Sequence, residues 1–266
     1  MWKRFDPSRP LGVLIAAVIA GILAGLVASV LLSFTAEPVI DQAIALEESH
    51  HAAGEAPNAA AEPEVVSRSQ QKGFGRFAAY GLGGGAYGVI FGLAFLSLRP
   101  RRGGDAWRRA LLAGALVAGA FTVMPFIKYP PNPPAVGDPA TISERQWKYL
   151  ALIFLSLVVL SAAARLSGRL RERQWLDDER LIAVGLAIVV PLGLILALLP
   201  PFSDPIEVPA NLVWRFRIAS LGGNLLLWAV LAVTFGAAAV RRERELTNPV
   251  AEGVAVGGAL QPVTTP

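Results

Sequence analysis

The sequence predicts an all-α fold, a polytopic membrane bundle of six transmembrane helices. The chain has 266 residues, of which 54% are hydrophobic and only 17% charged, and the charges are almost absent from six long apolar runs. A helix of about 20 residues rises ~1.5 Å per residue and crosses a hydrocarbon core of about 30 Å. Backbone groups in lipid must bond one another, which favours helices. The expected spans are 11–34, 77–98, 107–127, 147–166, 181–199 and 218–240.

The first span, 11–34, follows a positively charged start, so it is either a retained helix or a cleaved signal peptide. A retained helix is favoured because the run is longer than a signal's apolar region and Phe34-Thr35-Ala36 is a poor cleavage site.

The acidic and histidine-bearing outer loop spans 35–76. Its first part, 36–51, can continue the helix above the membrane, whereas 52–64 is rich in Ala, Pro and Glu and predicted to be flexible.

Small residues recur every four positions in the first two spans, which allows close approach of helix backbones in lipid. Tight helix packing is the favoured interpretation; the alternative is that Gly83-Gly84-Gly85 loosens the second helix beside a path. In the fifth span, Pro191 leaves a carbonyl without its helical donor and predicts a kink, either harmless or a gating point. The small residues are Gly21, Gly25 and Ser29 in the first span and Gly81, Gly84, Gly85, Gly88 and Gly92 in the second.

The later spans are separated by segments that cannot continue a helix. Proline lacks a backbone donor and restrains its neighbour, so 129–139 and 200–209 are expected to be loops. The run 181–199 is apolar on every face, which is typical of lipid surroundings rather than of a soluble helix. The transmembrane domain is expected over 1–245, and 246–266 has the composition of a disordered tail.

Basic residues alternate between the connections in a way that predicts topology. With the amino terminus inside, sixteen of the 24 Lys and Arg residues fall in inner segments. Cytoplasmic loops retain positive charge, so both termini are expected in the cytoplasm. The net charge of +4 comes from basic residues clustered at the ends of spans, where topology explains them. No basic motif interleaved with aromatic residues accompanies that charge, so nucleic-acid binding is not expected.

The residue inventory limits the chemistry. The chain has no cysteine, which removes disulfides, thiolate metal ligands and cysteine nucleophiles. No ionisable residue lies near the middle of a span, which is uncommon for a proton-coupled pump. Nucleotide-binding, zinc-protease and serine-hydrolase motifs are missing, so energy from ATP would need another chain. No permanently bound cofactor and no enzymatic activity are expected.

Both histidines of the chain lie in one acidic segment of the first outer loop. On a helix, Glu47 faces His50 and His51 at spacings of three and four, and Glu48 faces His51. Imidazole with carboxylate suits a divalent ion such as Co, Ni or Zn, so these four residues are the candidate metal ligands. The alternative is an acidic, solvated helix face on which the histidines are incidental.

Further polar residues are expected together at the outer face. Positive charge is disfavoured outside, so Arg215 and Arg217 are expected to pair with acids such as Asp138, Glu144 or Glu207; a role in directing substrate is the alternative. The expected outer-face cluster comprises Glu37, Asp41, Lys128, Tyr129, Asn132, Asp138, Glu144, Arg145, Asn211, Arg215 and Arg217.

Four segments expected at the outer face have distinctive sequences. They are 37–48 with the histidines that follow, 66–68 before the glycine-rich second span, KYPPNPPAVG at 128–137 and PANLVWRFR at 209–217. Together they resemble one family, the CbtA cobalt transporter subunits. The resemblance covers about residues 8–240. It implies a multi-pass permease component of the bacterial inner membrane that takes up cobalt for cobalamin supply and pairs with a small histidine-bearing CbtB subunit. It brings no established catalytic residues.

The leading hypothesis is a six-helix subunit that admits Co²⁺ as substrate, captured outside by the Glu/His segment and passed to the proline-rich loops. A membrane enzyme acting on a lipid-linked or periplasmic substrate, with Lys128, Asp138 and Glu144 as polar groups, is one alternative. A non-transporting scaffold for a partner is the other. The lipid bilayer is one expected partner. The sequence leaves open whether a second copy of the chain is another.

Overall fold

The computed structural model describes residues 9–54, 67–98, 106–134, 136, 141–202, 206 and 208–247. Within that part every regular element is helical, and six helices are long and apolar enough to cross a membrane, as predicted. Side chains are described neither for 50–54 nor after 245. The predicted tail therefore lies almost wholly outside the described residues, and α9 runs to Thr247.

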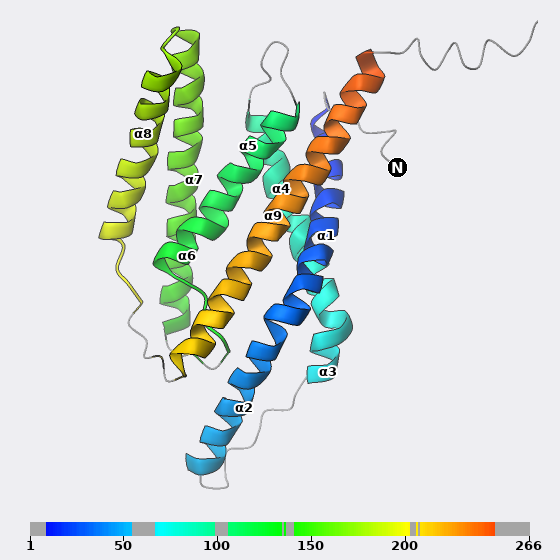
Figure 1. Cartoon of the computed structure of the whole chain (residues 1–266), viewed down its shortest axis with the longest axis vertical. Coiled ribbons are helices and arrows are strands. Elements are labelled where there is room, and N and C mark those ends of the chain that lie inside the picture. Colours follow the sequence, from blue (N-terminus) through cyan, green and yellow to red (C-terminus); the bar gives the residue numbers. More distant parts are fainter. Residues whose placement is uncertain are drawn as a thin grey trace, which may run out of the picture.

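The six spans follow one another up and down the bundle (Figure 1). An additional helix, α2 (Glu37–Gly54), continues from the end of the first span. The spans are α1 (Pro10–Thr35); α3 (Arg68–Gln70), η2 (Gln71–Gly75) and α4 (Arg76–Ser97); α5 (Ala106–Ala118), η3 (Gly119–Val123) and α6 (Met124–Lys128); α7 (Ile142–Glu172); α8 (Asp177–Leu198); and α9 (Ala210–Thr247).

Four spans, α1, α4, α5 and α9, enclose the main core. Phe91 and Phe95 of α4 meet Phe235 of α9 edge-on, with ring centroids 5.2 and 4.9 Å apart. Trp228 of α9 is buried and donates from Nε1 to the Thr122 hydroxyl at 2.9 Å. Dispersion between close-packed groups and bonds of this kind hold helices together where lipid is as apolar as the side chains.

The α1–α4 contact is a seam of glycines. A Cβ on Gly21 would overlap the Gly84 carbonyl oxygen and lie 2.9 Å from Gly88 Cα, and a Cβ on Gly25 would overlap the Tyr80 carbonyl oxygen. The backbones therefore meet where only hydrogen atoms fit between them. This is the tight packing that the four-residue spacing predicts. α4 remains a regular helix through 83–85, and the described residues give no sign of the alternative loosening.

Two wider turns interrupt the second and third spans. In η3, the π-helical turn Gly119–Val123 ends just before Pro125, which has no N–H to give to the carbonyl four residues earlier. A local π turn re-satisfies such backbone groups inside a membrane helix. In η2, Gly73 takes a non-helical conformation (φ −85°, ψ −120°) and separates α3 from α4. The sequence analysis anticipated neither turn.

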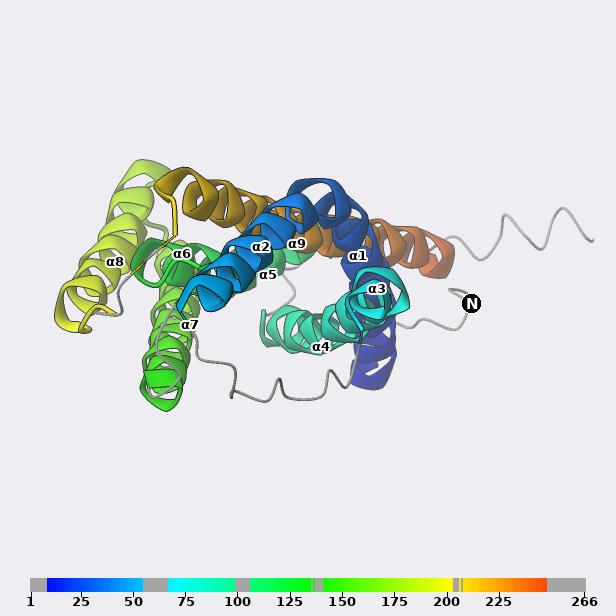
Figure 2. The ribbon, with the colours of Figure 1, turned by 90° about the horizontal axis from the view of Figure 1, so that it is seen from below.

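The α7–α8 pair stands at one side of the bundle (Figures 1 and 2). It joins the core through a small cluster of Met124, Tyr129 and Leu152, against which α8 packs its last two turns. Only 6% of the most apolar 18-residue stretch of α8 is buried inside the protein. An apolar helix left this open needs lipid around it, which agrees with the sequence prediction that 181–199 is surrounded by lipid.

Candidate functional site

Helix α2 carries the predicted metal ligands and extends past the end of the bundle (Figure 1). Only Ala36 separates it from α1, and Pro38 lies in its first turn, where a missing N–H costs no helical bond. Val39 and Ala43 are fully buried against Leu212 of α9, with Leu46 packed beside them. This apolar stripe at helical spacing fixes one face of α2 on the start of α9.

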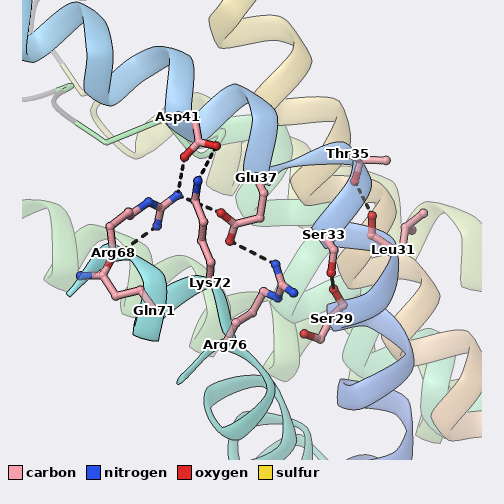
Figure 3. Close-up of polar contacts among 10 residues, drawn as sticks. All are labelled: Ser29, Leu31, Ser33, Thr35, Glu37, Asp41, Arg68, Gln71, Lys72 and Arg76. Carbon is pink, nitrogen blue, oxygen red and sulfur yellow. Dashed lines mark hydrogen bonds and ion pairs between the residues drawn. The ribbon is translucent and has the colours of Figure 1, made fainter. Parts of the chain in front are cut away.

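The acidic face of α2 meets a row of cations from the start of the second span (Figure 3). Arg68 donates from Nη2 to Glu37 Oε2 at 2.8 Å and to Asp41 Oδ1 at 3.1 Å. Lys72 donates to Asp41 Oδ2 at 2.7 Å, and Arg76 Nη1 lies 3.5 Å from Glu37 Oε1. Five charged side chains therefore form one network that ties α2 to α3, η2 and α4.

The side chains of this network differ in how far they are buried. The side chains of Glu37 and Arg76 are 15% and 14% exposed, whereas that of Asp41 is 43% exposed. Pairs that are partly withdrawn from water are screened less than pairs on the surface. The hydrogen bond from Lys72, more than that from Arg68, lowers the pKa of Asp41 below its usual value of 3.8, although partial burial opposes the shift. Asp41 therefore stays ionised at neutral pH.

The sequence analysis placed Glu37 and Asp41 at the outer face but missed their three partners. The signal was present: residues 68, 72 and 76 are basic and four apart, and residues 37 and 41 are acidic and four apart. Each set falls on one helical stripe. Recognising them as partners required knowing that the two stripes face each other.

The predicted metal segment lies at the far end of α2. Glu47 is half-buried and Glu48 exposed, and neither forms an ion pair with another described residue. The backbones of His50 and His51 belong to α2, but their side chains lie outside the described residues. Among the side chains that are described, no group of three or more His, Asp or Glu could hold a metal ion. The metal site stays a prediction.

The proline-rich connection after α6 holds the end of α8. Lys128 Nζ donates to the Leu196 carbonyl at 2.8 Å, and the Tyr129 hydroxyl donates to the Pro200 carbonyl at 2.8 Å. The rings of Tyr129 and Phe202 stack with centroids 4.1 Å apart. Terminal carbonyls of a helix lack intrahelical donors and carry partial negative charge, so a lysine stabilises them. Lys128 and Tyr129 thus have structural partners.

The two arginines near the start of α9 find amides and carbonyls in the described structure. Arg217 donates to Asn132 Oδ1 at 2.8 Å and to the Pro131 carbonyl at 3.3 Å, and Arg215 donates to Gln42 Oε1 at 3.3 Å. Glu144, expected as their partner, pairs with Lys148 at 2.6 Å. Asp138 and Glu207, the other expected acids, lie outside the described residues. Asn211 is exposed.

An open cleft of about 640 Å³ lies between the proline-rich connection and the start of α7. Arg145 brings a positive charge to it, and no carboxylate is among its described lining residues. A divalent cation prefers carboxylate and imidazole to a guanidinium wall. The lining residues are Tyr129, Pro130, Pro131, Asn132, Val136, Ile142, Arg145, Gln146, Tyr149, Leu150 and Phe202.

Comparison with known families decides the identity of this arrangement. A family model described as "Probable cobalt transporter subunit (CbtA)" matches residues 12–240, which includes most of the first and last spans and everything between them. The chain belongs to the CbtA family. Membership agrees with the resemblance seen in the sequence and with a multi-pass membrane protein. A search of curated proteins and a search of solved structures each found no match.

The CbtA description fits a subunit of a transporter rather than an enzyme. The two described polar groups of the enzymatic alternative have structural partners. Lys128 caps α8, Glu144 pairs with Lys148 near the start of α7, and Asp138 is outside the described residues. At this end of the bundle, a described network of five charged side chains anchors α2.

Proposed function

We propose that this CbtA protein is the membrane-embedded permease subunit for Co²⁺ uptake in the bacterial inner membrane, acting in cobalamin supply. The family match over 12–240 carries the proposal. The six-span bundle supports it, since a path for an ion needs several helices around it. Co²⁺ is the substrate here and not a resident cofactor. The family's description as a subunit supports a partner, and a small CbtB-type subunit is the partner in this proposal.

Capture of Co²⁺ is proposed at Glu47, Glu48, His50 and His51. The acids nearer the bundle, Glu37 and Asp41, are already engaged by Arg68, Lys72 and Arg76. Those five groups carry one net positive charge, which repels a cation. The two glutamates farther along α2 have no ion pair within the described part, and α2 keeps helical spacing through both histidines. The end of α2 is therefore the better receptor.

Binding of Co²⁺ to the purified protein tests the capture site directly. The double variant His50→Ala/His51→Ala is expected to weaken Co²⁺ binding at least 10-fold, measured by isothermal titration in detergent at pH 7.5. Wild-type affinity should also fall below about pH 6, where imidazole with a pKa near 6.5 takes up a proton. Asp177→Asn/Asp178→Asn removes two acids from α8 instead and serves as the control for nonspecific attraction of Co²⁺ to carboxylates. Unchanged affinity in the histidine variant would remove the capture site.

Uptake of radioactive cobalt tests the transport role separately. Cells that contain the protein together with its partner subunit are expected to accumulate more Co²⁺ than cells without it, with Ni²⁺ and Zn²⁺ as competitors. If uptake depends on the protein but not on His50 and His51, transport stands and capture falls. If no metal is taken up, the permease proposal itself is wrong.

The proposed orientation places α2 and the charged network in the periplasm and both termini in the cytoplasm. The bias of Lys and Arg toward the inner connections supports it. A reporter that is active only in the cytoplasm, fused after Pro266, is expected to be active. A reporter that is active only in the periplasm should work when inserted near position 60. The opposite pattern would invert the topology.

A further inference from the structure

A second cleft of about 640 Å³ lies at the opposite end of the bundle, between the start of α5 and the end of α9. Its described lining is Trp107, Ala237, Val240, Arg241, Arg244 and Glu245. Part of this lining is apolar and part is basic. The division follows α9 itself, which has no charged residue over 218–240 and is charged from Arg241 onward.

The apolar floor is fixed by close packing. A Cβ on Gly236 would lie 2.9 Å from Trp107 Cε3, so the indole ring rests directly on the backbone of α9. Tryptophan favours the boundary between hydrocarbon and headgroups because most of its ring is apolar and its N–H is polar. Trp107 therefore marks the depth at which the cleft leaves the hydrocarbon.

The rim carries an excess of positive charge. Residues 106–110 and 237–245 together contain five arginines and two glutamates. One arginine is committed to the bundle, because Arg109 lies over the Phe95 ring at 4.2 Å and donates to the Phe95 carbonyl. Glu245 is engaged by Arg242 at 2.8 Å. The exposed side chains of Arg241 and Arg244 border the cleft and set its sign.

We infer that this cleft binds the phosphate headgroup of an anionic phospholipid, with an acyl chain lying along Trp107, Ala237 and Val240. Guanidinium groups bind phosphate through two parallel hydrogen bonds, and basic pockets between helices at a membrane surface favour anionic headgroups. Binding such a lipid requires both the basic rim and the apolar floor. The basic rim attracts the phosphate, and the apolar floor retains a ligand that has a hydrocarbon tail.

Lipid binding to the detergent-purified protein, in the absence of cobalt, tests this inference. Native mass spectrometry would measure the affinity for phosphatidylglycerol and for phosphatidylcholine. Wild type is expected to prefer phosphatidylglycerol. Because each arginine near a headgroup contributes about 1 kcal/mol, Arg241→Gln/Arg244→Gln should weaken phosphatidylglycerol binding by about 10- to 30-fold. Arg171→Gln/Arg173→Gln removes two exposed arginines from the end of α7 and is the matched control.

Three results would overturn the inference. The first is equal affinity for the two lipids. The second is an equal loss of phosphatidylglycerol binding in both double variants, which would indicate a general charge effect. The third is displacement of the lipid by inorganic phosphate at the affinity of the lipid itself, since a free phosphate ion would then be the ligand. Lipid binding is measured without metal, so failure here leaves the cobalt proposal untouched.

Discussion

Substitution of Gly84 by alanine should separate α1 from α4. The added Cβ would overlap the carbonyl oxygen of Gly21 and lie 3.0 Å from Gly25 Cα, whereas carbon atoms in contact prefer about 3.5–4.0 Å. Both neighbours are backbone atoms, so no side chain can rotate away. The two helices must therefore move apart by roughly 0.5–1 Å along the seam, a gap that forfeits a quarter to a half of each dispersion contact.

The expected cost follows from this geometry. Overpacking of a well-packed contact typically costs about 1–3 kcal/mol. Alanine also favours a helix over glycine by up to ~1 kcal/mol, which would mask part of the loss. Gly83→Ala provides the correction, because a Cβ there meets nothing within 4 Å. The difference between these two neighbouring variants isolates the packing cost, at about 1–3 kcal/mol.

Unfolding in mixed micelles with increasing sodium dodecyl sulfate, followed by circular dichroism, measures this difference. Gly84→Ala is expected to unfold at a clearly lower mole fraction of the denaturing detergent than Gly83→Ala. Gly83→Ala should match wild type or exceed it. If the two variants unfold together, the backbone contact between α1 and α4 does not exist as described, and the seam would have to be rejected.

Three further changes probe other contacts. Thr122→Val leaves the buried indole N–H of Trp228 without its acceptor and should destabilise the protein by about 1–3 kcal/mol in the same unfolding assay, whereas Thr234→Val, which loses only a bond to its own helix, should cost less. Lys128→Met should raise hydrogen exchange in the last turn of α8; protection equal to wild type would refute the capping role. The lowered pKa of Asp41 means that its ion pairs are fully present above its usual pKa of 3.8 and are lost as the pH falls through the lower folded value. As the pH falls through that lower value, spin labels on α2 and α3 should move apart, and Asp41→Asn should reduce this pH dependence, with Glu37 still pairing with Arg68.

Much of the architecture could be predicted from the sequence. Lipid solvates no backbone polar group, so each long apolar run had only one regular structure available, and all six runs are helices in the structure. The helical continuation beyond the first span was also predicted correctly, since 36–51 lacks a helix breaker after its first turn. The four-residue spacing of glycines predicted the close approach of α1 to α4, because only glycine leaves both backbones free of a Cβ at each turn.

Pairing across distance needed the tertiary structure. The basic stripe 68–76 and the acidic stripe 37–41 were each readable, but only the kink at Gly73 and the anchoring of α2 on α9 bring them face to face. Lys128 looked like a free outer cation until the end of α8 proved to lie beside it. A sequence lists charges in chain order, whereas Coulomb energy depends on distance in space. Local chemistry therefore determined the helices, and packing decided which polar groups meet.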